Sequence, residues 1–182
     1  MGILRKVRPE DIHQITEIYN EFVKGSTATF ETEPLYEAEM AERIRTISAV
    51  YPYYVFEVNG DVAGFCYLHR WKDRAAYRNT LEDTIYIAPQ YHRQGIGRSM
   101  LTALIADASA EGYRAIIACI TAGNEGSIAL HQELGFRQVS HFIDVGEKFG
   151  QTLGVIDMEL ILPNLSPMRF NSASPQCPDI DY

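Results

Sequence analysis

The chain has 182 residues, of which 46% are hydrophobic and 22% are charged. This length and composition suit one globular domain with a sizeable core. Its 16 basic and 24 acidic residues give a net charge of -8, which argues against sequence-independent binding to nucleic acid or to an anionic membrane.

The first elements predicted in chain order are strand 3–8 and a helix that starts after Pro9-Glu10-Asp11. Apolar residues recur at helical spacing from Ile12 to Phe22. A polar loop over residues 26–34 follows. The remaining predicted elements are helix 36–48, strands 53–58 and 62–69 around the hairpin turn 59–61, loop 71–79, strand 81–87, turn 88–97, helix 97–110, strand 115–120, helix 124–134, and strands 136–145 and 153–162.

This order of elements predicts an α/β (α+β) domain with a mixed, mainly antiparallel sheet over residues 1–162. Residues 163–182 are rich in Pro and Ser and are expected to form a tail. The N-terminus lacks the apolar core of a signal peptide and no stretch reaches transmembrane length, so a cytoplasmic location is expected. Cys66 and Cys119 lie in apolar runs and are expected to be buried, and no Cys or His spacing suggests a metal site.

A strand that contains Glu82 leads into a turn with Arg93, Gly95 and Gly97, and a helix follows. This arrangement directs backbone N–H groups and a helix dipole at a phosphate. A P-loop is excluded because Arg98 follows Gly97, and a Rossmann fingerprint because Met100 stands at the third glycine position. The alternative is a tight turn that needs only positive φ.

Two longer motifs decide between these possibilities. The run Glu82-x-x-x-Tyr86-Ile87-x-Pro89-x-x-x-Arg93-x-Gly95-x-Gly97 resembles the acyl-CoA-binding motif of the GCN5-related N-acetyltransferases (GNAT). Residues 124–136, Asn124-x-x-Ser127-x-x-Leu130-His131-x-x-Leu134-Gly135-Phe136, resemble the later helix of the same superfamily. Residues 26–34, Trp71–Glu82 and Gly146-x-Lys148-Phe149-Gly150 are similar to the phosphinothricin and methionine sulfoximine acetyltransferases.

The resemblance covers about residues 3–162. It implies six or seven strands, about four helices, acetyl-CoA as co-substrate, no metal, and a homodimer. It also implies that cofactor-binding residues are Ile85, Tyr86, Ile87, Arg93, Gln94, Gly95, Ile96, Gly97, Arg98, Asn124 and Ser127. Two departures are His92, where the superfamily usually has Gln or Arg, and Gln151–Gly154, where the family has a Trp and an Asp.

Acetyl transfer to an amine needs a base, because the attacking amine must be neutral. Glu82 is the candidate base, since burial in an apolar strand would raise its pKa. The alternative is a solvated carboxylate or one paired with Arg78. The resemblance implies that the backbone N–H of Ile87 meets the oxyanion. His131 stands where many relatives have a Tyr general acid, and the alternative is a helix histidine bonded to its neighbours.

For the acceptor, Arg74 offers a fork that suits a carboxylate or a phosphinate. The alternative is a surface arginine in a charged loop. Further candidates for the acceptor pocket are Phe30, Lys72, Ala75, Ala76 and Tyr77. The sequence thus predicts an N-acetyltransferase that acts on the α-amine of a small amino-acid-like acceptor, such as phosphinothricin, methionine sulfoximine or methionine sulfone, through a tetrahedral intermediate. The rival functions are a protein or peptide N-acetyltransferase and an inactive acyl-CoA-binding sensor.

Overall fold

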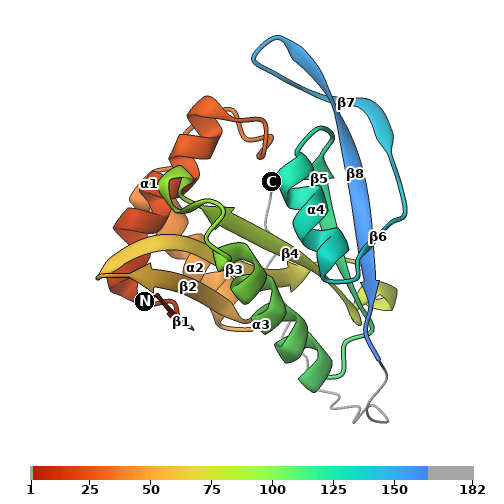
Figure 1. The fold of residues 1–182 in the computed structure, drawn as a ribbon, viewed down its shortest axis with the longest axis horizontal. Coiled ribbons are helices and arrows are strands. Elements are labelled where there is room, and N and C mark those ends of the chain that lie inside the picture. Colours follow the sequence, from red (N-terminus) through yellow and green to blue (C-terminus); the bar gives the residue numbers. More distant parts are fainter. Residues whose placement is uncertain (1, 164–182) are drawn as a thin grey trace.

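One eight-stranded sheet organises residues 2–163, which are the residues that the computed structural model describes (Figure 1). The strand order is β1-β2-β3-β4-β5-β8-β6, and β7 also pairs with β8. Only the β4–β5 pair is parallel, so the expected mixed, mainly antiparallel sheet is confirmed. The strands are β1 (Ile3–Lys6), β2 (Tyr53–Val58), β3 (Asp61–Arg70), β4 (Thr80–Ile87), β5 (Ala115–Thr121), β6 (Arg137–Gln138), β7 (Phe142–Lys148) and β8 (Gln151–Ile161).

Four α-helices in the described residues cover the two faces of the sheet. They are α1 (Ile12–Gly25), α2 (Glu37–Ser48), α3 (Ile96–Ala110) and α4 (Glu125–Glu133), with short 3-10 turns at η1 (Pro9–Asp11), η2 (Ala75–Tyr77) and η3 (Pro89–Tyr91). None of these helices is long and apolar enough to cross a membrane. The predicted tail lies outside the described residues, apart from Pro163.

Each face of the sheet has its own hydrophobic core, because successive side chains of a strand point to opposite faces. Phe65 of β3 is buried in the cluster that contains Ile15 of α1. Its neighbour Cys66 is buried in the other cluster, together with Leu101 of α3. α1 and α2 therefore close one face, and α3 and α4 close the other.

The parallel pairing of β4 with β5 stops after three residue pairs, of which Glu82↔Ile117 is the last. Beyond this point β4 stays paired with β3 up to Gly64↔Ile87. β5 stays paired with β8 up to Thr121↔Val155. The sheet therefore splits into two halves that diverge after Glu82.

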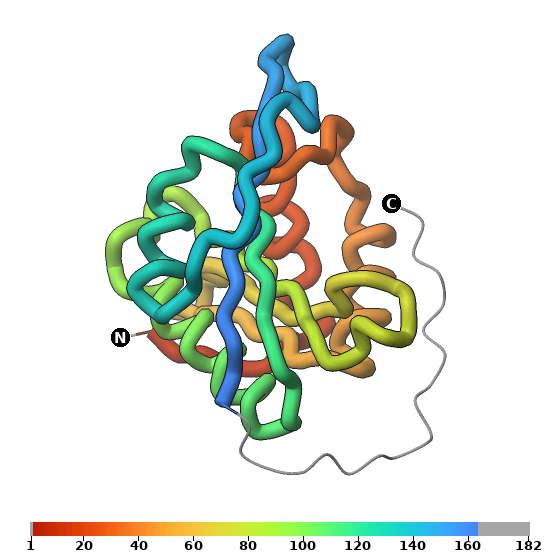
Figure 2. Tube along the Cα trace, turned by 90° about the vertical axis from the view of Figure 1, so that its right-hand side faces the viewer, coloured from red at the N-terminus to blue at the C-terminus, as the bar shows by residue number. Residues whose placement is uncertain are grey.

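The predicted single strand over residues 136–145 is wrong, because the chain forms two separate strands there. β6 pairs with the end of β8 near Met158, and β7 pairs with its beginning. Between the pairs Phe142↔Val155 and Gly146↔Leu153, β7 advances four residues while β8 advances two. The resulting bulge bends the β7–β8 hairpin, which extends beyond the rest of the sheet beside the segment between α1 and α2 (Figure 2).

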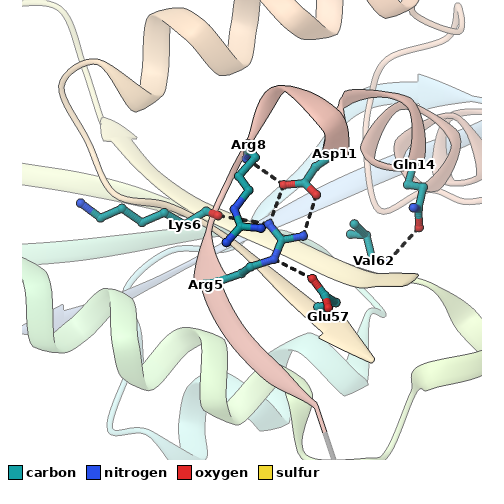
Figure 3. Close-up of polar contacts among 7 residues, drawn as sticks. All are labelled: Arg5, Lys6, Arg8, Asp11, Gln14, Glu57 and Val62. Atoms are coloured by element: carbon teal, nitrogen blue, oxygen red, sulfur yellow. Dashed lines mark hydrogen bonds and ion pairs between the residues drawn. The ribbon is translucent and has the colours of Figure 1, made fainter. Parts of the chain in front are cut away.

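An ion-pair network ties the first strand to the start of α1 (Figure 3). The Arg5 guanidinium makes two hydrogen bonds to Asp11, at 2.8 and 2.7 Å, and a third to Glu57 at 2.7 Å. Asp11 is buried and also accepts a hydrogen bond from the backbone N–H of Arg8. Burial alone would raise the pKa of Asp11, but the Arg5 and Arg8 bonds hold it below its ordinary value.

We predict that Arg5→Ala lowers the free energy of unfolding by about 1–3 kcal/mol, because it leaves the Asp11 carboxylate buried without its main partner. Urea denaturation at pH 7 measures this difference. Arg45→Ala is the control, since it removes an exposed pair with Glu42 and should change stability little. Equal effects of the two substitutions would contradict the structural role of Arg5.

Candidate active site

A cavity of about 1510 Å³ opens where β4 and β5 diverge. One end lies between α1, α2 and the start of the β3–β4 loop, and the other lies between the start of α3 and α4. Pockets for ordinary small molecules measure about 300–1,000 Å³. This cavity can therefore hold a long ligand that passes through the divided sheet.

The glycine turn forms one end of the cavity, with Arg93, Gly95 and Gly97 in its lining. Gly95 is the N-cap of α3 and has φ 78°, which glycine adopts without strain. It offers no side chain to the N–H groups of the first turn, which are thus available to an anion. A Cβ on Gly97 would lie 3.0 Å from Leu130 and 3.2 Å from Ile87, so this position also permits close helix packing.

Most of the predicted cofactor-binding residues meet in this cavity. Gln94 does not line it, and its side-chain amide donates to the Gln90 carbonyl instead. His92, one of the departures from the superfamily pattern, has its Nε2 2.8 Å from the Ile87 carbonyl oxygen and caps the end of β4. The residues that line the cavity as predicted are Ile85, Tyr86, Ile87, Arg93, Gly95, Ile96, Gly97, Arg98, Asn124 and Ser127.

Glu82 lies in the cavity at the last paired position of β4. Burial raises its pKa to about 7, and the nearby charges of Asp83 and Asp157 add to this shift. The nearest cationic candidate is His69 of β3, whose Nε2 lies 3.8 Å from Glu82 Oε1. Burial lowers the pKa of His69, so the ring stays neutral and does not oppose the shift. A carboxylate with a pKa near 7 is suited to general-base work at neutral pH.

His69 is the register partner of Glu82 on the neighbouring strand β3, and its ring faces the carboxylate. Its Nδ1 lies 2.9 Å from the Arg70 carbonyl oxygen, which can only accept, so Nδ1 bears the ring hydrogen. The lone pair of a neutral ring is then on Nε2, which faces Glu82. Nε2 and Glu82 Oε1, 3.8 Å apart, lie beyond hydrogen-bond distance, so the ring takes no proton directly from Glu82 in this arrangement.

His131 is buried, at 3% exposure, and both ring nitrogens have partners. Nδ1 lies 2.7 Å from the Ser127 carbonyl oxygen and Nε2 lies 3.1 Å from Asp83 Oδ2. Burial alone would lower the pKa of His131, but the bond with Asp83 raises it above its ordinary value. These two bonds agree with the alternative interpretation of His131, a helix histidine that is hydrogen-bonded to its neighbours. Neither ring N–H is free for direct proton transfer.

Only one of the predicted acceptor-binding residues lines the cavity. Phe30 lines the cavity, whereas the predicted members of the β3–β4 loop, Lys72, Arg74, Ala75, Ala76 and Tyr77, do not. Lys72 Nζ instead stacks 4.0 Å above the Trp71 ring. Arg74 is exposed at the N-cap of η2, which agrees with the alternative interpretation, a surface arginine in a charged loop. The arginines at this end of the cavity are Arg43 and Arg70.

Several lining residues escaped the sequence analysis, among them Thr29, Glu31, His69, Asp83, Cys119 and Thr121. The expectation that Cys119 is buried is wrong: it is exposed in the cavity because β5 has lost β4 as a neighbour there. Burial of part of this side chain still raises the pKa of its thiol to about 12, so the thiol is protonated. His69 lies opposite Glu82 in the register of β3 and β4, a pairing that the loop between these strands does not fix from the sequence alone.

Comparison with known proteins is consistent with this geometry. Residues 13–136 match the model of the acetyltransferase (GNAT) family. The chain belongs to the GNAT acetyltransferase family. It is 39% identical over 158 residues to phosphinothricin N-acetyltransferase of Alcaligenes faecalis, covering 86% of this chain and 80% of that protein. It is 33% identical over 171 residues to the L-methionine sulfoximine/L-methionine sulfone acetyltransferase of Pseudomonas paraeruginosa, covering 91% and 96%.

Solved GNAT structures have the same fold. The crystal structure of a phosphinothricin acetyltransferase from Sinorhizobium meliloti in complex with acetyl-CoA superposes with a TM-score of 0.86, at 39% identity, over 88% of each chain. This GNAT chain is therefore an acetyl-CoA-dependent acetyltransferase. Its own residues fit such a co-substrate, because uncapped N–H groups and two arginines lie at one end of a long cavity and a carboxylate lies at its middle.

We predict that Glu82→Gln makes the enzyme more stable at pH 8 than the wild type. The folded-state pKa near 7 lies above the ordinary 4.5, so the wild type loses stability as the pH rises from 4.5 through 7. The amide does not titrate, and the gain at pH 8 should be about 3 kcal/mol.

Thermal unfolding of both proteins at pH 5 and pH 8 measures this difference. Glu21→Gln, on the exposed side of α1, is the control and should show no pH-dependent gain. A Glu82→Gln variant that follows the wild type at both pH values would refute the desolvation of Glu82.

Proposed function

We propose that this GNAT enzyme transfers the acetyl group of acetyl-CoA to the α-amine of a small amino-acid-like acceptor. The candidate acceptors are phosphinothricin, methionine sulfoximine and methionine sulfone, after the names of its relatives. The strongest support is the place of Glu82, a partly buried carboxylate with a pKa near 7 at the division of the sheet. Cytoplasmic localisation stays a prediction.

In the proposed reaction Glu82 removes the proton of the acceptor ammonium and the neutral amine attacks the thioester carbonyl. The oxyanion of the tetrahedral intermediate is stabilised by the backbone N–H of Ile87, at the end of β4, as the resemblance implies. The amine is positioned by the cavity walls, so the two reactants meet in one orientation.

The co-substrate is proposed to lie along the free edge of β4. Backbone groups of Ile85, Tyr86 and Ile87 would pair with the pantetheine arm as an added strand would. The turn from Arg93 to Arg98 would hold the pyrophosphate with its backbone N–H groups and the dipole of α3. Asn124 and Ser127, at the start of α4, would hydrogen-bond the arm from the opposite side.

We propose an electrostatic role for His131 in place of direct proton donation to sulfur. Its Nδ1 donates to the Ser127 carbonyl and its Nε2 to Asp83, so the bonded ring is an imidazolium with both hydrogens engaged. Its positive charge lies in the lining of the cavity and would favour the thiolate that leaves. Asp83 then acts as the residue that positions and charges this ring.

The main test is release of free thiol from acetyl-CoA with a panel of amino acids, methionine sulfoximine, methionine sulfone, phosphinothricin and a peptide. We expect turnover with small α-amino acceptors and a loss of about 100-fold in kcat for Glu82→Gln. The wild-type rate should rise with pH through about 7 as Glu82 loses its proton, and this limb should be absent in the variant.

Each rival function has its own outcome in this assay. Turnover with the peptide alone would identify a protein acetyltransferase, and tight acetyl-CoA binding without turnover would identify a sensor. Glu21→Gln serves as the control for Glu82→Gln and should keep the wild-type rate. An unchanged pH profile in Glu82→Gln would remove Glu82 as the base.

We also propose that two copies associate through the β7–β8 hairpin. Four large apolar side chains are exposed within residues 142–149, which form β7 and the turn after it. Ile143 is the most exposed of them at 72%, and the others are Phe142, Val145 and Phe149. Exposed apolar patches mark interaction surfaces, so we place the subunit contact here.

We predict that Ile143→Asp converts a dimer of the wild type into a monomer, because the carboxylate would be buried without a partner. Sedimentation velocity at micromolar concentrations measures the change. Val50→Asp, which replaces an exposed valine after α2, is the control and should leave the dimer intact. A monomeric wild type would contradict the proposal.

A further inference from the structure

The loop between α1 and α2 forms one wall of the cavity, with Ala28, Thr29, Phe30 and Glu31 in the lining. The part of this loop that lines the cavity lies outside any helix or strand. Its position is therefore set by contacts with other elements rather than by its own backbone hydrogen bonds. These contacts decide the shape of the cavity where the acceptor is proposed to bind.

Four elements hold the loop in place. Each of the four makes one hydrogen bond to the loop. The Tyr19 and Thr29 hydroxyl oxygens are 3.1 Å apart; Arg43 Nη1 donates to Glu31 Oε1 at 2.6 Å, Thr121 Oγ1 to the Thr27 carbonyl at 2.6 Å, and Lys148 Nζ to the Thr29 carbonyl at 2.8 Å. The last comes from the β7–β8 hairpin.

Lys148 is an unusual residue to find in this position. Only 3% of it is exposed, and burial lowers the pKa of its ammonium. A buried ammonium is unfavourable unless it is hydrogen-bonded. Its bond to the Thr29 carbonyl, with the charge of Glu31 nearby, offsets part of this penalty. The hairpin is thus joined to the loop at a fixed point.

Gly146 makes the second contact between the hairpin and the loop. A Cβ built on it would lie 2.2 Å from Cε2 and 2.7 Å from Cδ2 of the Phe30 ring, closer than real side chains allow. The ring therefore lies directly on the backbone of β7, at the point where the bulge ends. Its other side faces the cavity, since Phe30 is among the lining residues.

We propose that the β7–β8 hairpin sets the width of the acceptor pocket, with Gly146 and Lys148 as positioning residues that act through Phe30 and Thr29. Neither Gly146 nor Lys148 lines the cavity itself. The glycine lets the ring withdraw from the cavity, and the lysine fixes the backbone next to it. The inference rests on the proposed function, because it concerns the acceptor of that same reaction.

The test is the effect of Gly146→Ala on the two Michaelis constants. The added methyl group pushes the Phe30 ring into the cavity, so the KM for the acceptor should rise about 10-fold while the KM for acetyl-CoA stays within about 2-fold. Gly25→Ala is the matched control, because a Cβ at Gly25 meets nothing within 4 Å, and both constants should stay at the wild-type values.

A double variant shows whether the effect passes through the ring. In the Phe30→Ala background, Gly146→Ala should no longer change the KM for the acceptor. Lys148→Met should also raise this constant, whereas Lys24→Met, at an exposed lysine of α1, should not. Thermal unfolding of every variant identifies loss of the fold, and Lys148→Met replaces Gly146→Ala if the latter does not fold.

The outcomes separate this inference from the proposed function. If the wild type acetylates none of the small acceptors, the proposed function fails. If it acetylates them but the hairpin variants leave the KM for the acceptor unchanged, the inference fails and the function stands. An equal rise in the KM for acetyl-CoA, or the same effect of Gly146→Ala with and without Phe30, would also overturn the inference.

Discussion

The early end of the parallel pairing between β4 and β5 is the constraint on which the rest of the site depends. Three residue pairs join two half-sheets, and each half keeps its own antiparallel partners beyond Glu82. The separation creates a cavity in what would otherwise be a continuous sheet. It also leaves the carboxylate of Glu82 partly desolvated next to that opening, and this desolvation is the main cause of the raised pKa of Glu82.

Successive side chains of β4 point to opposite faces of the sheet, so the neighbours Glu82 and Asp83 have different surroundings. Glu82 faces the side of α1 and α2, next to His69. Asp83 faces the side of α3 and α4, where it charges His131. One strand thus supplies a candidate base with a pKa near 7 on one face and a hydrogen-bond partner for His131 on the other.

Local patterns predicted most of the fold, but not the contacts between distant segments. The turn with Gly95 and Gly97, and the helix after it, follow from residues close in sequence, so they were found. The acceptor side of the cavity was not found, because nothing in the local sequence shows that Arg43, in the middle of α2, meets the cavity while Arg74, in the β3–β4 loop, does not. The bulge that divides residues 136–145 and the bond between His131 and Asp83 likewise depend on residues far away in the sequence.

The β7–β8 hairpin contacts Phe30 at Gly146 and also carries exposed apolar side chains, of which Ile143 is one. A partner that binds these side chains more tightly when the acceptor is bound is coupled to acceptor binding, and thermodynamic linkage makes that coupling reciprocal. If two copies meet there, acceptor binding would tighten their association by the same factor by which association tightens binding. The enzyme's apparent affinity would then vary with its own concentration, and a dilute assay would understate it.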